Sequence, residues 1–539
     1  MFALYLTVVA GLGVFGAIRS NTVSDYLLAD RSLSAPVAAL SEQATLWSGW
    51  ITVGFPGTIY SGGLSAAWWL FWCIPGSLFS WAVLAKRFSR YTRILKALTI
   101  PEFLGARFSR RSTSIKLLSI ATIIWFYFFY VAVQVLAGAD TMNGGLGFDW
   151  SLAFGLTILF VVFYTIIGGF FAVSLSDVLQ GILMLIFASV VPVFVLVDLG
   201  GFSQFVTQFN EVGTAAQTSW TGGLSGIALV VTIVGVIGFG FPFAGMPHGV
   251  TRYMSMKRPS KIGFAMLTAA LFMGIALVGI PFIAIGGMIM FPDVEQDLIS
   301  SIMISELLPG WLAGLLLAGI VAAVMSSADS MLLLAGSAVG EDVYKNFVNP
   351  DASNERVIFV TRLAVLVVGA AAAAIAWVTP ATVHTLTEYA WGGLGVTFAS
   401  VFLLSVYWEG MTGEGTLAGL VTGLVSTTTW HYSLSGGPIG IFDIYLVFPC
   451  LLITVGVIIL VSWVTGPPGD PESVKEELKA ITTPLADEVE IVRRERDEGP
   501  TPTTTNADPI AVTEIEAVEG FVQQFDLDEL PTANQEAVE

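Results

Sequence analysis

The 539-residue sequence has few charged side chains, few histidines and few cysteines. Asp, Glu, Lys and Arg make up only 12% of the residues, and the chain has three His and two Cys. Cys73 and Cys450 lie in apolar surroundings and lack the spacing of a metal site or a redox motif. The apolar segments also lack a nucleophile paired with a base, and they lack a set of metal ligands. We therefore expect a protein that is not an enzyme and that binds no cofactor.

Long apolar runs take the place of a charged surface. Hydrophobic residues make up 55% of the chain, and its mean hydropathy is +0.78. Many runs reach about 18 to 25 residues, the length that crosses roughly 30 Å of hydrocarbon. The sequence therefore predicts an all-α polytopic membrane protein with about thirteen transmembrane helices. The predicted spans are 2–18, 36–61, 66–85, 115–140, 149–168, 173–197, 223–246, 262–290, 310–335, 357–378, 385–407, 413–430 and 443–465.

The positions of the basic residues predict which side of the membrane each loop faces. With these spans, all 23 Lys and Arg residues fall on one side of the membrane. The loops on the other side, such as 199–222 and 291–308, contain acidic residues but no Lys or Arg. Cytoplasmic loops are enriched in Lys and Arg. We therefore expect a multi-pass protein of the plasma membrane with its N-terminus outside and its C-terminus in the cytoplasm. The basic residues between Lys86 and Lys116 are expected to contact lipid head groups, and no nucleic-acid partner is indicated.

The C-terminal segment has a different composition from the rest of the chain. Of the 41 Asp and Glu residues, 19 lie after Trp463, together with only five of the 23 Lys and Arg residues. A segment with low hydrophobicity and high net charge cannot bury enough apolar surface to order itself. We expect a largely disordered cytoplasmic tail over 467–539, with short helices at most near 472–480 and 510–525.

Two predicted spans carry glycine and proline at their centres. Span two contains "TLWSGWITVGFPG" (45–57), and span seven contains "GFGFPFAGMPHG" (238–249). An interrupted helix leaves backbone groups unpaired inside the membrane unless protein, water or a ligand satisfies them. Broken helices at matching positions of two inverted repeats are typical of secondary transporters. Proline kinks closed by neighbouring side chains are the alternative interpretation.

This repeat pattern predicts the domain organisation of the chain. Spans two to six and seven to eleven each form a five-helix repeat, and the odd number of helices inverts the second copy. The predicted parts are a first helix and loop (1–35), a first inverted repeat (36–198), an external loop with the second repeat (199–410), two flanking helices (411–466) and the tail (467–539).

Span nine carries hydroxyl groups at membrane depth. In "VAAVMSSADSMLLLAG" (321–336), Ala323, Ser326, Ser327 and Ser330 share one helical face about 100° wide. Close helix packing through small residues is one explanation for this stripe. A stripe of hydroxyls facing a broken helix also matches the neutral oxygen ligands that an alkali cation needs. Asp329 lies off the stripe, and acids at this depth are usually functional, so Asp329, Glu42 and Glu388 are candidate functional residues. A solvated helix end is the alternative for Glu42, and pairing with a neighbouring hydroxyl or backbone group is the alternative for Glu388.

Several long blocks of the sequence, in this order, resemble a known family of transporters. The blocks are "ADRSLSAPVAALSEQATLWSGWITVGFPGTIYSGGLSAAW" (29–68), "ALTIPEFLGARF" (97–108), "IIGGFFAVSLSDVLQG" (166–181), "GMPHGVTRYM" (245–254), "PGWLAGLLLAGIVAAVMSSADSMLLLAGSAVGEDVYK" (309–345) and "YAWGGLGVTF" (389–398). They resemble the sodium:solute symporter family, and most of all its sodium/proline symporter branch. The resemblance implies the amino acid-sodium symporter-like fold, a five-plus-five inverted-repeat core with flanking helices.

The resemblance also implies the positions of an ion site and a solute site. It places the sodium ligands on the carbonyls of Ala44, Trp47 and Ala323 and on the hydroxyls of Ser326 and Ser327. It assigns Asp177 to an ion exit path or a second ion site, and Asp329 is expected to supply negative charge near the ion. The solute region falls on Ser48 and Gly49 in span two and on Phe239, Phe243 and Pro247 in span seven. The branch carries Asp where this chain has Leu46, and it carries Trp and Tyr where this chain has Phe239 and Phe243.

We therefore predict a secondary active transporter. It would carry a small organic solute into the cell together with sodium by alternating access, and proline or another small amino or carboxylic acid is the expected solute. The expected partners are this solute, the sodium ion and the lipid bilayer. Two alternatives stay open: a proton-coupled symporter of the same fold, since Leu46 removes one acid while Glu42 and Asp329 add two, and a membrane sensor with a transporter-like fold.

Overall fold

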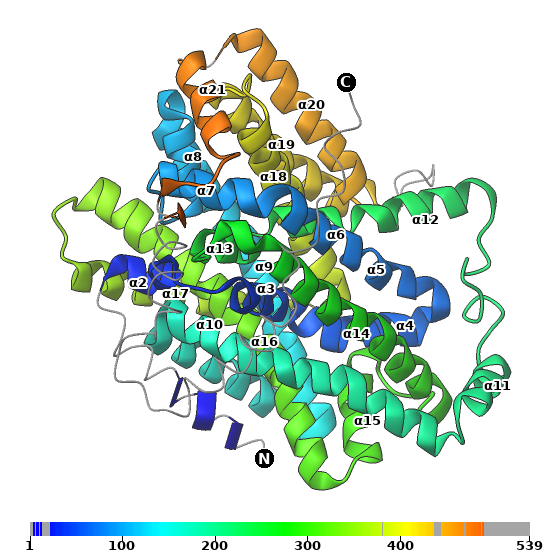
Figure 1. The fold of residues 1–539 in the computed structure, drawn as a ribbon. Coiled ribbons are helices and arrows are strands. Elements are labelled where there is room, and N and C mark those ends of the chain that lie inside the picture. The colour runs from blue at the N-terminus through cyan, green and yellow to red at the C-terminus, as the bar shows by residue number, and fades with distance from the viewer. Residues whose placement is uncertain are drawn as a thin grey trace.

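The structure is a computed structural model that describes residues 4–5, 7–9, 11–12, 22–379, 381–435, 444–467, 470–486 and 488–489. Most of the predicted first span and the tail beyond Val489 lie outside the described residues. Figure 1 shows the described chain as a bundle of long helices with shorter helices at both ends. Within the described residues the only β-type pairing is an isolated bridge between Leu33 and Met256, so the predicted all-α class is confirmed.

The N-terminal half of the described chain consists of long apolar helices joined by short ones. In chain order they are α2 (Val23–Leu28), η1 (Ala29–Arg31), α3 (Ala35–Gly49), η2 (Trp50–Gly54), α4 (Phe55–Gly62), η3 (Gly63–Ala66), α5 (Ala67–Phe71), α6 (Cys73–Phe79), η4 (Ser80–Ala85), α7 (Lys86–Ile94), α8 (Ile100–Arg107), η5 (Ser109–Arg111), α9 (Ser112–Leu146), α10 (Trp150–Asp198) and α11 (Phe202–Val212).

The C-terminal half follows the same pattern. In chain order its helices are α12 (Gly226–Gly238), η6 (Phe241–Gly245), α13 (Pro247–Ser255), η7 (Pro259–Lys261), α14 (Ile262–Met290), η8 (Gln296–Leu298), α15 (Ile299–Leu307), α16 (Gly310–Ser337), η9 (Ala338–Val348), α17 (Asn354–Val378), α18 (Val383–Tyr407), α19 (Gly413–Thr429), η10 (Trp430–Leu434), α20 (Val447–Thr465) and α21 (Pro471–Ala480).

Nine helical stretches within the described residues are long and apolar enough to cross a membrane. One of them, Ala35–Ile94, contains two of the predicted spans, and the predicted span at 413–430 corresponds to the 17-residue helix α19. The membrane character of the chain is thus confirmed, whereas the total of thirteen spans stays a prediction.

The 49-residue helix α10 contains the two spans predicted at 149–168 and 173–197. The Tyr164 hydroxyl donates to the Ser176 hydroxyl at 2.7 Å. Twelve residues of straight α-helix extend about 18 Å, further than a tyrosine side chain can reach. The chain therefore bends sharply between these two residues, which is compatible with two separate crossings.

The predicted interruptions of spans two and seven are both confirmed. In α3, Ser48 has φ 43° and ψ −174°, far from helical values. In span seven, α12 ends at Gly238, the 3-10 turn η6 follows, and Met246 is extended before α13 begins. The backbone amide of Gly49 donates to the Gln134 side-chain oxygen at 2.9 Å. A side chain of α9 thus satisfies part of the backbone that the break in α3 exposes.

Helix α3 occupies the centre of the bundle and contacts α10, α13, α14 and α16 (Figure 1). Its approach to α9 is closest at Gly49, where a Cβ atom would lie 2.5 Å from the Ala137 Cβ. Glycine is needed at this position because α9 leaves no room for a side chain beside the break.

Basic side chains, among them Arg31 and Arg107, gather at one end of the bundle around the Ala97, Met254 and Ser405 carbonyls. We call this end of the bundle the basic face. Arg31 donates to the carbonyls of Met254 at 2.9 Å and of Ala97 at 2.6 Å. Arg107 donates to the carbonyl of Ser405 at 3.3 Å. These contacts join loops that are distant in sequence, as the predicted segregation of basic residues requires.

Arg252 does not follow this pattern. From the predicted spans, Arg252 belongs to the basic loop between spans seven and eight. In the structure only 1% of its side chain is exposed, and it lies inside the helix bundle. The expectation of a loop residue is wrong for Arg252 because α13 extends through this position and packs on α3.

The first part of the acidic tail lies against the basic face. The short helix expected at 472–480 is present as α21. Glu488 forms a buried two-pronged ion pair with Arg90, with distances of 2.8 and 3.1 Å, and the Tyr91 hydroxyl donates to Glu477 at 2.7 Å. The tail is thus ordered at least in part up to Glu488, and disorder of 490–539 stays a prediction.

We predict that Gly49→Ala destabilises the protein. The added methyl group would have to push α3 away from Ala137, and overpacking of this kind costs about 1 to 3 kcal/mol. Thermal unfolding of the purified protein should show a lower Tm. Gly274→Ala in α14 is the matched control, because no atom lies within 4 Å of its added Cβ. Equal Tm values for the two variants would contradict the close approach at Gly49.

Candidate functional site

Oxygen atoms from α3 and α16 converge beside the break in α3, and we call this group the ion region. The Ser326 hydroxyl donates to the carbonyls of Ala44 at 2.9 Å and Ala323 at 3.0 Å. The Ser327 hydroxyl donates to the carbonyls of Thr45 at 2.7 Å and Ala323 at 3.2 Å. All these groups are fully buried. The structure therefore brings four of the five residues expected as sodium ligands into one cluster.

Trp47, the fifth expected residue, is engaged elsewhere. Its carbonyl accepts from the backbone amide of Trp50, and its indole NH donates to the Met273 sulfur at 3.2 Å. Thr45 takes part in the cluster instead: its carbonyl accepts from Ser327, and its hydroxyl donates to the Ser326 carbonyl at 2.8 Å. Sequence reasoning did not select Thr45, although its place between Ala44 and Ser48 pointed to it.

The chemistry of this cluster suits an alkali cation. Every oxygen in it belongs to a carbonyl or a hydroxyl group, and hard cations bind oxygen ligands of this kind. The hydroxyl protons currently point at the carbonyl oxygens. Rotation of the two serine O–H bonds away from these carbonyls would free lone pairs on both the hydroxyl and the carbonyl oxygens for a cation. Neutral oxygens can then replace the water molecules of a monovalent ion.

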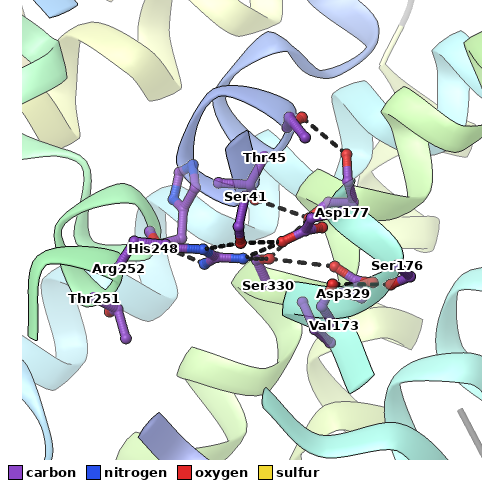
Figure 2. Close-up of polar contacts among 12 residues, drawn as sticks. Ser41, Thr45, Val173, Ser176, Asp177, His248, Thr251, Arg252, Asp329 and Ser330 are labelled. Atoms are coloured by element: carbon purple, nitrogen blue, oxygen red, sulfur yellow. Dashed lines mark hydrogen bonds and ion pairs between the residues drawn. The ribbon is translucent and has the colours of Figure 1, made fainter. Parts of the chain in front are cut away.

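A buried arginine ties four helices together next to the ion region. Figure 2 shows the Arg252 guanidinium between Ser41, Asp177 and Ser330. It donates to the Ser41 hydroxyl at 3.0 Å, to Asp177 at 2.8 Å and to the Ser330 hydroxyl at 2.7 Å. Another of its nitrogens donates to the His248 carbonyl at 2.7 Å. We call this group the Arg252 clasp; it joins α3, α10, α13 and α16.

The Arg252 clasp is directly connected to the ion region. The Ser330 hydroxyl, which accepts from Arg252, donates to the Ser326 carbonyl at 2.8 Å. Asp177, expected on an ion path, is thus held by the arginine through one oxygen, while its Oδ1 has no hydrogen-bond partner among the described residues. Sequence reasoning missed Arg252, and its position in α13 after the break in span seven was the available signal.

Asp329 adds a second carboxylate to this neighbourhood. Its Oδ1 accepts from the Ser330 hydroxyl at 3.3 Å, and its Oδ2 has no hydrogen-bond partner among the described residues. The side chain is fully buried. Only Asp177 of these two carboxylates is paired with Arg252, so Asp329 leaves negative charge beside the ion region if both are ionised. This agrees with the expected role of Asp329 as a source of charge, which stays a prediction.

Glu42 lies on the other side of α3 and is also fully buried. It accepts from the Trp81 indole NH at 3.2 Å and from the Tyr253 hydroxyl at 3.2 Å, and the Gln43 amide donates to it as well. A solvated helix end would leave Glu42 exposed. The structure thus places it among donors in the core, where its carboxyl group links α3 to η4 and α13.

The residues expected to contact the solute gather beside an aromatic group near the break. Phe239 packs against Trp50 and Trp391 at centroid distances of 5.5 and 5.8 Å, and Phe243 packs against Trp391 at 4.9 Å. The Trp391 indole NH donates to the Phe239 carbonyl at 3.1 Å. Ser48 approaches this group through the Trp50 backbone amide, which donates to its hydroxyl at 3.3 Å.

Polar atoms without partners lie around the same aromatic group. The Trp50 indole NH, the Tyr130 hydroxyl and the His248 Nε2 are buried and have no hydrogen-bond partner among the described residues. Tyr130 lies next to the Ser48 and Trp50 side chains, and its ring is 5.8 Å from that of His248. Buried polar atoms normally have partners. These atoms and the aromatic rings form what we call the solute region, which sequence reasoning found only in part.

Pro247 and Gly49 shape the solute region through the backbone. Pro247 begins α13 directly after the extended residue Met246, and its carbonyl accepts from the Thr251 hydroxyl at 2.7 Å. Proline at the first position of a helix lacks only an amide that would be unpaired there anyway. Gly49 permits the contact between α3 and α9 described above. Pro247 and Gly49 thus position neighbouring groups. Neither has a polar side-chain atom that could contact a solute.

Known transporters resemble this chain over most of its length. The sequence model described as the sodium:solute symporter family matches residues 26–423. A sodium/proline symporter of Haemophilus influenzae is 32% identical over 480 residues, which cover 87% of this chain and 94% of that protein. The high-affinity proline transporter PutP of Bacillus subtilis is 32% identical over 429 residues, covering 78% and 89%. A sodium/proline symporter of Staphylococcus aureus is 30% identical over 485 residues, covering 87% and 93%.

A solved structure shows the same fold. A Na+-coupled sialic acid symporter in its substrate-bound outward-open state superposes with a TM-score of 0.70 at 21% identity, covering 86% of this chain and 96% of that chain. The arrangement of helices in Figure 1 is thus the fold of that structure.

We predict that Arg252→Ala strongly destabilises the protein. Removing one partner of a buried ion pair costs about 3 to 5 kcal/mol, because the remaining charge is left uncompensated. The double variant Arg252→Ala/Asp177→Asn should recover part of this loss, as measured by thermal unfolding. Arg110→Ala is the control, since 69% of the Arg110 side chain is exposed. A double variant with no recovery would show that the charge pair with Asp177 does not stabilise the fold.

Proposed function

The chain belongs to the sodium:solute symporter family, and we propose that it transports proline or a closely related small amino acid together with sodium. As a family member it is a multi-pass membrane protein that couples solute movement to sodium. The observation that carries the proposal is the convergence of the Ser326 and Ser327 hydroxyls on the Ala44, Thr45 and Ala323 carbonyls beside the break in α3.

The proposed sodium ligands are the carbonyls of Ala44 and Ala323 and the hydroxyls of Ser326 and Ser327. The Trp47 carbonyl would join them only if it releases the Trp50 amide. Sodium bound here would hold α3 against α16. Since Ser48 and Gly49 follow the ion ligands within one turn, fixing α3 also fixes one wall of the solute region. Binding of the ion and the solute would then strengthen each other by the same factor.

Proline as the solute is supported by the names of the relatives and by the solute region. The rings of Phe239, Trp50 and Trp391 offer an apolar surface for a compact aliphatic solute. The branch-specific Trp and Tyr are absent at Phe239 and Phe243, so polar contacts must come from other residues. The Trp50 indole NH and the Tyr130 hydroxyl can donate to a carboxylate.

The sodium gradient supplies enough free energy for accumulation. One charge moving through 100 mV contributes about 2.3 kcal/mol, and a tenfold concentration ratio contributes about 1.4 kcal/mol. The enrichment of Lys and Arg in cytoplasmic loops favours a cytoplasmic position for the basic face. We therefore propose an orientation in the plasma membrane with the N-terminus outside and the tail inside.

Proton coupling is a second candidate, favoured by one observation. Glu42 and Asp329 are buried carboxyl groups without an ion-pair partner within 4.0 Å among the described residues. A carboxyl group in such a place can carry a proton in place of a sodium ion. Uptake driven by a pH jump in sodium-free buffer would favour this candidate, whereas uptake that requires sodium at constant pH would favour sodium.

We predict that Ser326→Ala and Ser327→Ala each weaken the sodium dependence of uptake. Loss of one ligand hydroxyl should raise the sodium concentration for half-maximal uptake at least about tenfold, which corresponds to about 1.4 kcal/mol. Initial uptake rates in membrane vesicles at varied sodium measure this. Ser189→Ala is the control, because Ser189 is an exposed hydroxyl of α10 that bonds only to its own helix. Unchanged sodium dependence in both variants would reject the site.

We predict that labelled proline accumulates in vesicles under an inward sodium gradient. A panel of labelled small amino acids, carboxylic acids and urea-like solutes, each measured with and without sodium, defines the solute class. Accumulation of another solute without competition by proline would reject proline.

We predict that Tyr130→Phe lowers the apparent affinity for the transported solute about tenfold, since a hydrogen bond to a charged group is worth about 1.5 to 3 kcal/mol.

A further inference from the structure

A crevice at the basic-face end of α16 contains polar side chains that the proposed ion region does not use. Its polar lining residues are Thr99, Thr251, Arg252, Ser330, Ser337 and Asp342, and the rest of its wall is apolar. Its cavity volume is about 20 Å³, which is room for about one water molecule or one small ion. Because Arg252 and Ser330 line it, the crevice borders the Arg252 clasp.

Asp342 is the carboxylate of this crevice. Its side chain is fully buried, and its Oδ1 accepts from the Thr99 hydroxyl at 2.7 Å. Its Oδ2 has no hydrogen-bond partner, and no Lys or Arg of the described residues forms an ion pair with it. The neighbouring Glu341 differs, because Lys345 lies 2.6 Å from it. A buried carboxylate without a cation is costly unless an ion or a proton compensates its charge.

One continuous helical stretch connects Asp342 to the ion region. Ser326 and Ser327 lie in α16, Ser330 lies one turn further, and Ser337 ends the helix where η9 begins. The distance from Ser330 to Asp342 is about 18 Å along the axis, at 1.5 Å per residue. Ser330 and Ser337 are thus the two hydroxyls that this stretch places in the crevice between the ion region and Asp342.

The charges around the crevice favour a cation. Arg252 contributes the only guanidinium in its lining, and this group is already paired with Asp177 at 2.8 Å. Asp329 adds a further carboxylate next to Ser330. Around Asp342, Glu102 adds a negative charge and Lys116 a positive one, so that negative charge still exceeds positive charge along the route. Four of the five N–H donors of Arg252 are already engaged, by Ser41, His248, Asp177 and Ser330.

We propose that Asp342, Thr99 and Ser337 form a second, weaker binding site for a monovalent cation on the route by which sodium leaves the ion region. The Arg252 clasp separates the two sites. A sodium ion that leaves Ser326 and Ser327 passes the clasp when it loosens, and the Asp342 carboxylate receives the ion before water does. This inference rests on the proposed sodium symport and names a further site for the same ion.

Binding of radiolabelled sodium to the purified full-length protein tests this proposal without requiring a known solute. The wild type should bind a tight and a weak class of sodium. Asp342→Asn should remove the weak class and leave the tight class within about twofold, because Asn keeps the volume and the Thr99 contact but loses the charge. Ser326→Ala combined with Ser327→Ala should remove the tight class.

Glu341→Gln is the matched control, since it removes a neighbouring carboxylate of η9 that is already paired with Lys345. It should leave both classes unchanged. Ser337→Ala, whose hydroxyl bonds only to Leu334 of its own helix, should weaken the weak class and decides the matter if Asp342→Asn fails to fold. Unchanged weak binding in the Asp342 variant, or an equal loss in Glu341→Gln, overturns the proposed second site. Absence of the tight class in the wild type rejects the proposed function instead.

Discussion

The unwound backbone at Ser48 is the constraint around which the centre of this protein is organised. A helix that breaks inside a membrane must find partners for its amides and carbonyls, because neither lipid nor its own next turn can supply them. Gln134 of α9 accepts from the Gly49 amide, and the Ser326 and Ser327 hydroxyls of α16 donate to the Ala44 and Thr45 carbonyls. The hydrogen bonds that satisfy the backbone at this one break therefore connect α3, α9 and α16.

The same break explains how an ion and a solute can influence one another. The groups that face the ion region and those that face the solute region lie on the two sides of Ser48, within two turns of α3. A ligand that changes the position of α3 on one side therefore changes the wall that the other ligand meets. Coupling of this kind needs no long pathway through the fold.

Charge is the second requirement that shapes the core. Asp177, Asp329 and Glu42 are buried among helices, and Arg252 is the one buried guanidinium in contact with this group among the described residues. Each of these charges is costly in a low-dielectric interior. Arg252 compensates Asp177 and at the same time ties α3, α10, α13 and α16 together.

The sequence by itself determined the helical membrane class, the two interrupted spans and the hydroxyl stripe of span nine, because length, hydropathy, glycine and proline positions and helical periodicity are local properties. It also determined Ala44, Ala323, Ser326 and Ser327 as neighbours through resemblance to the family. Only the tertiary structure decided that Arg252 lies inside the bundle and that Thr45 joins the cluster while the Trp47 carbonyl bonds to Trp50. It alone also decided that Tyr130 lies beside Ser48, with His248 and Trp391 packed against the Tyr130 ring. The physical reason is that these partners come from helices separated by tens to hundreds of residues, and periodicity within one helix carries no information about which helix packs against it.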